Sequence, residues 1–195
     1  MASYYAIAAM SQAILSVLAN SRPRPEFSSC RFELYQAKDF QNPMDDGISL
    51  HLFRVATNAS RRTMTPYTAP DGRRYRPPLP LDLQYMLTAW ARDAVRQQRL
   101  LGWAMRTLED NPIFPSGLLN ESSPEPDTFH ASETVELVRD TLSIGDMYNL
   151  WEIAKHQQQP SATYTARLIS VESKLEMIEP GLVQTRVLRA GSADL

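Results

Sequence analysis

The clearest alternation of hydrophobic and polar positions lies in the middle of the chain, between Pro77 and Pro112. Prolines at 77, 78 and 80 fix their own φ at about −65° and disfavour helix just before them, so the chain enters this stretch extended. Apolar residues then recur at every second position, which predicts a strand over 81–90. The face predicted to be buried consists of Leu81, Leu83, Tyr85, Leu87 and Ala89. The other face mixes polar residues with Met86 and Trp90, so we expect it to be only partly covered.

From about Arg92 the hydrophobic spacing changes to that of an α-helix. Its predicted apolar face consists of Ala94, Gln98, Leu101, Ala104, Met105 and Leu108. The sequence Asp110-Asn111-Pro112 ends this helix, because Asn tolerates the left-handed cap conformation and proline lacks the N–H needed to continue.

The opposite side of the same helix combines one tryptophan with four arginines at steps of three and four residues. This stripe consists of Arg92, Arg96, Arg99, Trp103 and Arg106. Tryptophan and arginine are the residue types most enriched at binding hot spots, so the stripe is a candidate protein-contact surface. The alternative is a solvated helix face whose tryptophan lies on a neighbouring loop.

The first 20 residues are free of charge and have two interpretations. They resemble a signal peptide in hydrophobicity but lack its basic start and contain Ser11, Gln12 and Ser16. Their apolar residues repeat at helical spacing, which favours a packed N-terminal helix. The stretch is also too short to span a bilayer, so no membrane insertion is expected.

Further elements follow from the same reasoning. Strands are predicted over 31–36, 48–56, 134–141 and 162–173, and the apolar phase of the second shifts near Leu52, which indicates a bulge. Ser143 and Asp146 form a variant capping box that opens a helix through about His156. We therefore expect one α+β domain, with a mixed or mostly antiparallel sheet of about four or five strands flanked by three helices.

Two long polar segments have opposite charge. The segment 58–76 is basic, and the segment 115–132 carries Glu121, Glu125 and Asp127. The basic segment is either a loop that docks on an acidic partner or a solvated excursion. Together the two suggest head-to-tail contacts between subunits of a ring. The arginines of the basic segment are Arg61, Arg62, Arg73, Arg74 and Arg76.

The last residues are predicted to form a separate C-terminal arm over 178–195, following a domain over 1–177. Within it, Leu182–Leu188 has a strand-like sequence, with Val183, Val187 and Leu188 as candidate contact residues. An isolated strand is not stable alone. It therefore pairs either with the edge of its own domain or with the sheet of another chain.

The composition argues against several classes of function. The chain has 195 residues, a formal net charge of −2 and one cysteine, Cys30, so it has no disulfide framework, and a reducing cytoplasm suits it. Its three histidines and seven glycines form no metal-ligating, phosphate-binding or nucleophile motif. We expect no enzyme, no cofactor and no metal. The negative charge and the lack of aromatic stacking residues beside the basic segment also argue against nucleic acid.

Several of these segments together resemble a known family. The stretch Pro77 to Leu87, the run Arg99-Leu100-Leu101-Gly102 and the ending Asp110-Asn111-Pro112 are similar to the cap, or tail-terminator, proteins of phage-tail-like extracellular contractile injection systems. The stretches 48–55, 142–151 and 164–172 fit the same pattern. The resemblance covers about residues 5–174; Trp103 and the tail after Met177 depart from it.

This resemblance implies a structural role. Subunits would close into a hexameric ring on the end of the inner tube distal to the baseplate, contact the last sheath layer and stop polymerisation. The tail from Glu179 would reach the sheath by strand addition. The expected partners are further copies of the chain, the tube protein and the sheath protein, in a particle assembled in the cytoplasm. Another tail-completion or baseplate component is the alternative, and a nucleic-acid-binding module is a more distant one.

Overall fold

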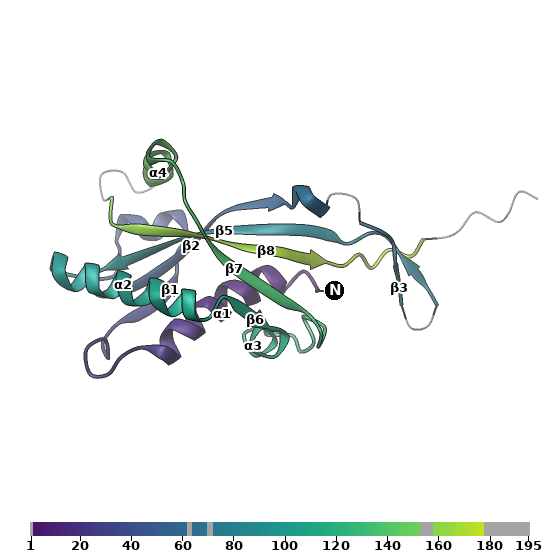
Figure 1. Cartoon of the computed structure of the whole chain (residues 1–195), viewed down its shortest axis with the longest axis horizontal. Helices are drawn as coiled ribbons and strands as arrows, with labels where there is room; N and C mark the ends of the chain where they lie inside the picture. Colours follow the sequence, from purple (N-terminus) through teal and green to yellow (C-terminus); the bar gives the residue numbers. More distant parts are fainter. Residues whose placement is uncertain (1, 62–63, 70–71, 153–157, 178–195) are drawn as a thin grey trace, which may run out of the picture.

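Strand β5 (Leu79–Trp90) lies inside a six-stranded sheet with the order β1-β2-β5-β8-β7-β6 (Figure 1). The computed structural model describes residues 2–61, 64–69, 72–152 and 158–177. Only β1 and β2 run parallel, so the sheet is mixed and mostly antiparallel, as predicted, with six strands where four or five were expected. The other strands are β1 (Arg31–Leu34), β2 (Gly47–Thr57), β6 (Ile113–Pro115), β7 (Thr134–Asp140) and β8 (Ser161–Val171).

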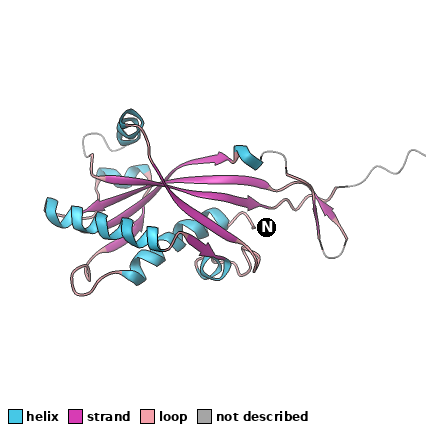
Figure 2. Ribbon diagram, viewed as in Figure 1, coloured by secondary structure: helices cyan, strands magenta, loops and turns pink. Residues whose placement is uncertain are grey.

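Four α-helices lie on the two faces of this sheet (Figure 2). Three of them, α1 (Ala6–Ser21), α2 (Ala94–Asp110) and α3 (Ser116–Glu121), cover one face, whereas α4 (Ile144–Trp151) lies on the other. Two short 3₁₀ helices, η1 (Ala37–Gln41) and η2 (Ala59–Arg61), flank β2. The α+β class is thus confirmed, and the additional helix is α3, whose six residues are too few to show a helical period.

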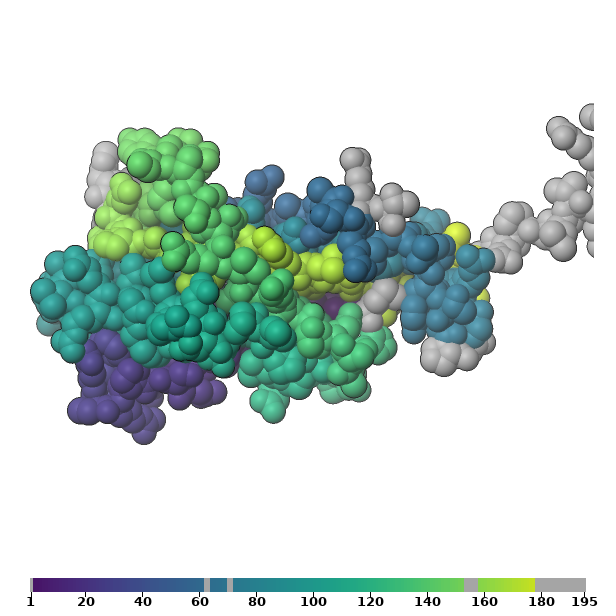
Figure 3. Space-filling view, viewed as in Figure 1, coloured from purple at the N-terminus to yellow at the C-terminus, as the bar shows by residue number. Residues whose placement is uncertain are grey.

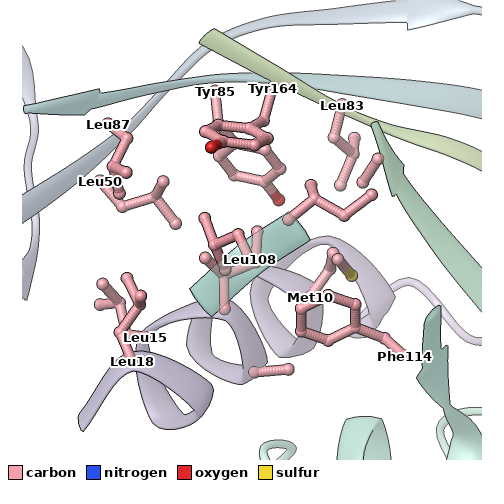
Figure 4. Packing of buried hydrophobic residues seen from close by; sticks show 14 of the residues in the cluster. Met10, Leu15, Leu18, Leu50, Leu83, Tyr85, Leu87, Leu108, Phe114 and Tyr164 are labelled. Carbon is pink, nitrogen blue, oxygen red and sulfur yellow. The ribbon is translucent and has the colours of Figure 1, made fainter. Parts of the chain in front are cut away.

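The larger core lies between β5 and the three helices, and Figure 4 shows the packing. All five residues predicted for the buried face of β5 belong to it. The N-terminal segment is a packed helix, as favoured by its periodicity, and contributes Met10, Ile14 and Leu18. A polar contact within this core joins the hydroxyls of Ser11 and Tyr85, which lie 3.0 Å apart in a buried position. Burial raises the pKa of the Tyr85 phenol.

A second, smaller core covers the opposite face at one end of the sheet. There Met86 and Trp90 of β5 pack with Phe40 of η1 and Trp151 of α4. The Trp90 indole donates to the Ser49 hydroxyl at 2.8 Å, which satisfies its buried N–H. Because both faces are buried here, this end of β5 is more covered than its mixed sequence predicted.

Two irregularities bend the strands on either side of β5. The predicted bulge near Leu52 is confirmed by a register shift between Leu52 and Arg54 on β2. On the other side, the pairing of β5 with β8 shifts between Leu81 and Leu83. There Leu168 has a φ of 59°, and its N–H donates to the Asp82 carboxylate at 2.9 Å. Bulges increase local twist, so the three central strands curve as they leave the helical layer.

Beyond this bend the chain builds a small projecting ribbon, visible at the right of Figure 3. Strands β3 (Tyr67–Thr68) and β4 (Arg74–Tyr75) pair antiparallel, with the Tyr67 and Tyr75 rings stacked at 6.4 Å. Residues 175–177 add to β4, since Arg76 N donates to Leu175 O at 3.0 Å and Met177 N to Arg74 O at 2.7 Å. We call β3, β4 and residues 172–177 the arm. The segment 58–76 is therefore partly a hairpin, and the prediction of a loop throughout was wrong.

The buried face of α2 differs from the prediction. Its buried residues are Gln97, Leu100, Ala104, Thr107 and Leu108, whereas Ala94 and Gln98 are exposed. Compared with the predicted orientation, α2 is turned so that Gln97 faces the sheet. The Gln97 side chain has hydrogen-bond partners there, since its Nε2 donates to Ala89 O at 2.9 Å and to Gln159 Oε1 at 2.7 Å. A polar residue with such partners can be buried at little cost.

Gly47 at the start of β2 has no room for a side chain. A Cβ there would lie 2.2 Å from Arg31 O and 2.6 Å from Met44 Sδ. We predict that Gly47→Ala lowers the unfolding free energy by about 2–4 kcal/mol in urea titrations, because backbone must move. Gly102 in α2 is the matched control, since a Cβ there meets nothing within 4 Å. Gly102→Ala should stabilise the protein by about 0.5–1 kcal/mol, and equal effects at both positions would contradict this packing.

Candidate assembly surfaces

The arginine stripe of α2 begins with a well-formed helix cap. Asp93 is the N-cap residue, and its carboxylate accepts the N–H of Arg96 at 2.9 Å. This start turns the stripe toward the segment 22–30 and the turn at Asp45 and Asp46, both of which precede neighbouring strands. The stripe therefore lies over another part of its own chain.

Arg96 is the most constrained member of the stripe. Its Nε and Nη2 donate to the two oxygens of Asp46, each at 2.8 Å, in a bidentate pair. Nη1 donates to Glu26 O at 3.1 Å, and the guanidinium lies 5.5 Å from the centre of the Phe27 ring. Arg96 thus fixes the segment 22–30 against the start of β2.

Trp103 is not directed away from the core, so that prediction was wrong. It is partly buried against the larger core, with its ring 5.6 Å from Phe27 and 6.1 Å from Phe32. Its contact with Phe27 of the segment 22–30 agrees with one part of the alternative, the placement of this tryptophan against a neighbouring loop. Removing this indole would open a gap between two aromatic rings, so Trp103 is unsuitable for testing an interface.

The remaining arginines of the stripe form exposed ion pairs. Arg92 contacts Asp45 at 3.2 Å, Arg99 contacts Glu26, and Arg106 contacts Asp110 one turn along α2. Exposed pairs of this kind contribute little to stability and exchange partners readily. These side chains are consequently available to a second subunit, and their interface role stays a prediction.

The cluster around Asp46 has the strongest electrostatics. Hydrogen bonds from Arg96 lower the pKa of the Asp46 carboxyl, and the carboxylate in turn raises the pKa of the Arg96 guanidinium. Burial, followed by the charge of Asp46, raises the pKa of the Cys30 thiol to about 11. A thiol with that pKa is almost fully protonated at neutral pH and unreactive, which fits a structural cluster.

The arginines of the basic segment lie on a second surface, away from the stripe. Arg73, Arg74 and Arg76 are exposed on the arm, and Arg61 ends η2 after β2. In Figure 1 the N-terminal end of α2 lies at the left and the arm at the right. Arg62 lies outside the described residues, as do Val183, Val187 and Leu188. Sequence reasoning missed Tyr67 and Tyr75; Tyr75 stands between Arg74 and Arg76, whereas Tyr67 follows Pro66.

The acidic segment 115–132 lies between β6 and β7 and contains α3. Glu121, Glu125 and Asp127 are exposed, whereas Thr128 and Phe129 are buried and fix the segment to the domain. Asn120 holds both ends of this turn, since its Nδ2 donates to Phe129 O and its Oδ1 accepts from Phe129 N. An acidic surface is thus held in a defined shape.

The His, Cys, Asp and Glu side chains of the described residues are not grouped as a metal site requires. No group of three His, Cys, Asp or Glu residues is placed to hold a metal ion among those residues. His51 is buried, with Nδ1 2.8 Å from Tyr35 O and its ring edge-on to Phe40, so its role is structural. His156 lies outside the described residues. In the described chain, no helix combines the length and hydrophobicity that crossing a bilayer would require.

Comparison with known families identifies the chain. The sequence profile of the Pvc16 N-terminal domain matches residues 9–185, which is most of the sequence. The chain belongs to the Pvc16 N-terminal domain family. No curated protein matches the sequence at a significant level.

Two solved structures share the fold of this Pvc16 N-terminal domain. One is the sheath/tube terminator of an extracellular contractile injection system, PVC, in its extended state, with a TM-score of 0.62, 12% identity and 95% of this chain covered. The other is the tube-terminating cap of the anti-feeding prophage, with a TM-score of 0.52, 15% identity and 92% of this chain covered. The chain spans 64% and 59% of the length of those two proteins.

The Arg96–Asp46 pair should stabilise the domain in a pH-dependent way. The folded-state pKa of Asp46 is lowered. The pair therefore contributes fully to the unfolding free energy above the ordinary Asp pKa of about 3.9, and this contribution is lost as pH falls through the lower folded-state pKa. We predict that Arg96→Met lowers the unfolding free energy by about 1–3 kcal/mol at pH 7. In urea titrations this difference from the wild type should shrink below about pH 4.

The exposed Arg99 provides the matched control for this measurement. Arg99→Met removes one charge from the same helix face but only an exposed ion pair, so it should change stability little. An Arg96→Met effect that is constant down to pH 3, or one equalled by Arg99→Met, would contradict the role assigned to the pair.

Proposed function

We propose that this chain terminates a contractile injection system. Copies of the chain form a ring on the end of the inner tube distal to the baseplate, contact the last sheath layer and end polymerisation of both. The observation that carries the proposal is the family match over residues 9–185. The likeness in fold to a sheath/tube terminator and a tube-terminating cap, each over more than nine-tenths of this chain, supports it.

Termination by a ring requires two different faces. One face must be complementary to the last tube and sheath subunits, and the other must offer no equivalent surface to the next layer. This function needs binding surfaces and no reacting groups. The fold suits it, since a rigid two-sided sheet carries the stripe of α2 at one end and the arm at the other.

The exposed basic and acidic surfaces together suggest how copies meet. Surfaces at opposite ends of a subunit make head-to-tail contacts, which close into a ring when the rotation between subunits divides a full turn. A hexamer is the ring size we propose. The exposed arginines of α2 and of the arm supply the protomer or tube contacts, and acidic side chains such as Glu121 and Glu125 are their complement.

The C-terminal segment 178–195, which is distinct from the arm defined above and was predicted to add a strand to the sheath, lies outside the described residues. The particle is proposed to assemble in the cytoplasm and to be released with this cap in place.

Deleting the chain from cells that make the particle gives the direct test. Without a terminator, tube and sheath lack a stop, so we predict tubes of irregular length in negative-stain images, with a broad distribution in place of one sharp length. Re-expression of the chain should restore the sharp length. Uniform tubes in the deletion strain would contradict a terminator role and favour another tail component.

Charge reversal tests the proposed subunit contacts. We predict that Arg99→Glu with Arg106→Glu leaves a folded domain, because both side chains are exposed, but abolishes rings in mass photometry. Arg54→Glu with Arg167→Glu is the control with the same charge change on exposed residues of β2 and β8, outside the α2 stripe. Rings that survive the first pair as well as the second would remove the α2 stripe from the interface.

A further inference from the structure

Strand β1 is the terminal strand of the sheet and carries a groove along its outer side. One hollow of about 540 Å³ lies between α1, β1 and the segment 39–44. A second hollow of about 560 Å³ continues between α1 and the end of β1, and both are lined by Leu34 and Tyr35. We call these two adjoining hollows the β1 groove. Its floor is a strand edge.

The backbone of β1 is placed to accept another strand. Arg31 N donates to Asp46 O and Tyr35 N to Leu50 O, so these residues direct their N–H groups toward β2. Successive residues of a strand alternate in this direction, so Phe32 and Leu34 direct theirs outward into the groove. An edge of this kind is a template for strand addition.

The two edges of the sheet differ in protection. At β6 the strand has only three residues, ends in Pro115 and leads directly into α3. Such features block strand addition. Strand β1 contains no proline and no bulge, and in the described chain no strand lies on its outer side. The sheet is therefore open to extension on the β1 side.

The walls of the groove specify the side chains of the strand that it would take. The wall formed by α1 contributes Ile7 and Ala8, next to Leu34, which is 39% exposed. The other side of the groove is lined by polar groups that already have partners: Glu33 pairs with Arg31 at 3.1 Å, and Asp39 accepts from Gln36 N at 2.7 Å. A fitting strand has small apolar residues on the face toward α1.

We propose that the β1 groove receives the segment Leu182–Leu188 of a second copy of the chain, in place of the addition to the sheath that the resemblance implies. In an extended conformation this segment has Val183, Thr185 and Val187 on one face and Arg186 on the other. The first face matches the apolar wall. Burying two valines and adding the backbone bonds of a seventh strand would stabilise the contact.

The length of the chain requires a second copy. Only residues 178–181 separate Met177 from Leu182, and four residues span at most about 14 Å. The arm follows the Leu79 end of β5, whereas Leu34 pairs with Leu50, which pairs with Leu87. Eight residues of strand measure about 26 Å. The segment therefore cannot reach the groove of its own domain, but it can reach that of an adjacent subunit.

Site-directed disulfides test this arrangement in the full chain. Two variants of the full chain are purified, both with Cys30→Ala. The first carries Leu34→Cys, and the second carries one cysteine in place of Val183, Thr185 or Val187. Mixed under mild oxidation, they should form a disulfide-linked dimer with one partner from each population, detected by mass spectrometry, for at least one tail position. Placing both cysteines in one chain should give linked multimers on gels and no internally bridged monomer.

Two controls make the result decisive. Ile113→Cys, 60% exposed on the opposite edge strand, should not cross-link to the tail positions. Thr185→Pro should raise the dissociation constant for self-association about tenfold or more, because proline removes a ladder donor.

Three results would overturn the proposal. These are cross-links equally strong at Ile113, an internal bridge within single chains, and a tail that binds purified sheath subunits but never cross-links to Leu34→Cys. Because the readout is self-association of the purified chain, failure here would leave the proposed terminator role untouched.

Discussion

The whole structure depends on the packing of β5 on both of its faces. Its odd-numbered residues from Leu81 to Ala89 contact three helices, while Met86 and Trp90 contact a second aromatic core below η1 and α4. A strand held from both sides cannot slip by one residue, because every side chain would then move to the wrong core. This constraint fixes the register of β2 and β8, and through them the position of the edge strand β1.

The same strand separates the molecule into a rigid body and a projecting part. Both bulges adjoin β5 where the helical layer ends, and from there the chain leads into the arm. The strands of the arm are short, and they are stabilised by the Tyr67–Tyr75 stack and by pairing with residues 175–177. A subunit with a rigid centre and contact surfaces at its ends is suited to building a closed ring. The proposed roles of α2, the arm and the β1 groove are parts of one arrangement, in which each subunit contacts two neighbours.

The sequence predicted the elements whose periodicity reflects burial. The faces of β5, the bulge at Leu52 and the Ser143 cap could be inferred because each is a local pattern. The face of α2 could not, because Gln97 is buried through bonds to Ala89 and Gln159, which periodicity does not reveal. The hairpin of the arm was missed since its two-residue strands gain their third partner from residues near Glu176, far along the chain.

The candidate surfaces show the same limit. The spacing of the α2 arginines correctly predicted that they share one helix face. Whether that face is exposed to solvent or covered by the same chain depends on the segment 22–30. The path of this segment is fixed by Phe27 and by the Arg96–Asp46 pair. The β1 groove had no sequence signal, because it arises from strand order. Edge strands can be recognised only when the complete order of the sheet is known.

Where the chain lies on an assembled particle tests the central claim most directly. Particles carrying this chain with an affinity label can be imaged by cryo-electron microscopy, with the label located relative to the baseplate. The account predicts a single ring of label at the tube end distal to the baseplate. Label along the tube, at the baseplate or absent from intact particles would contradict it.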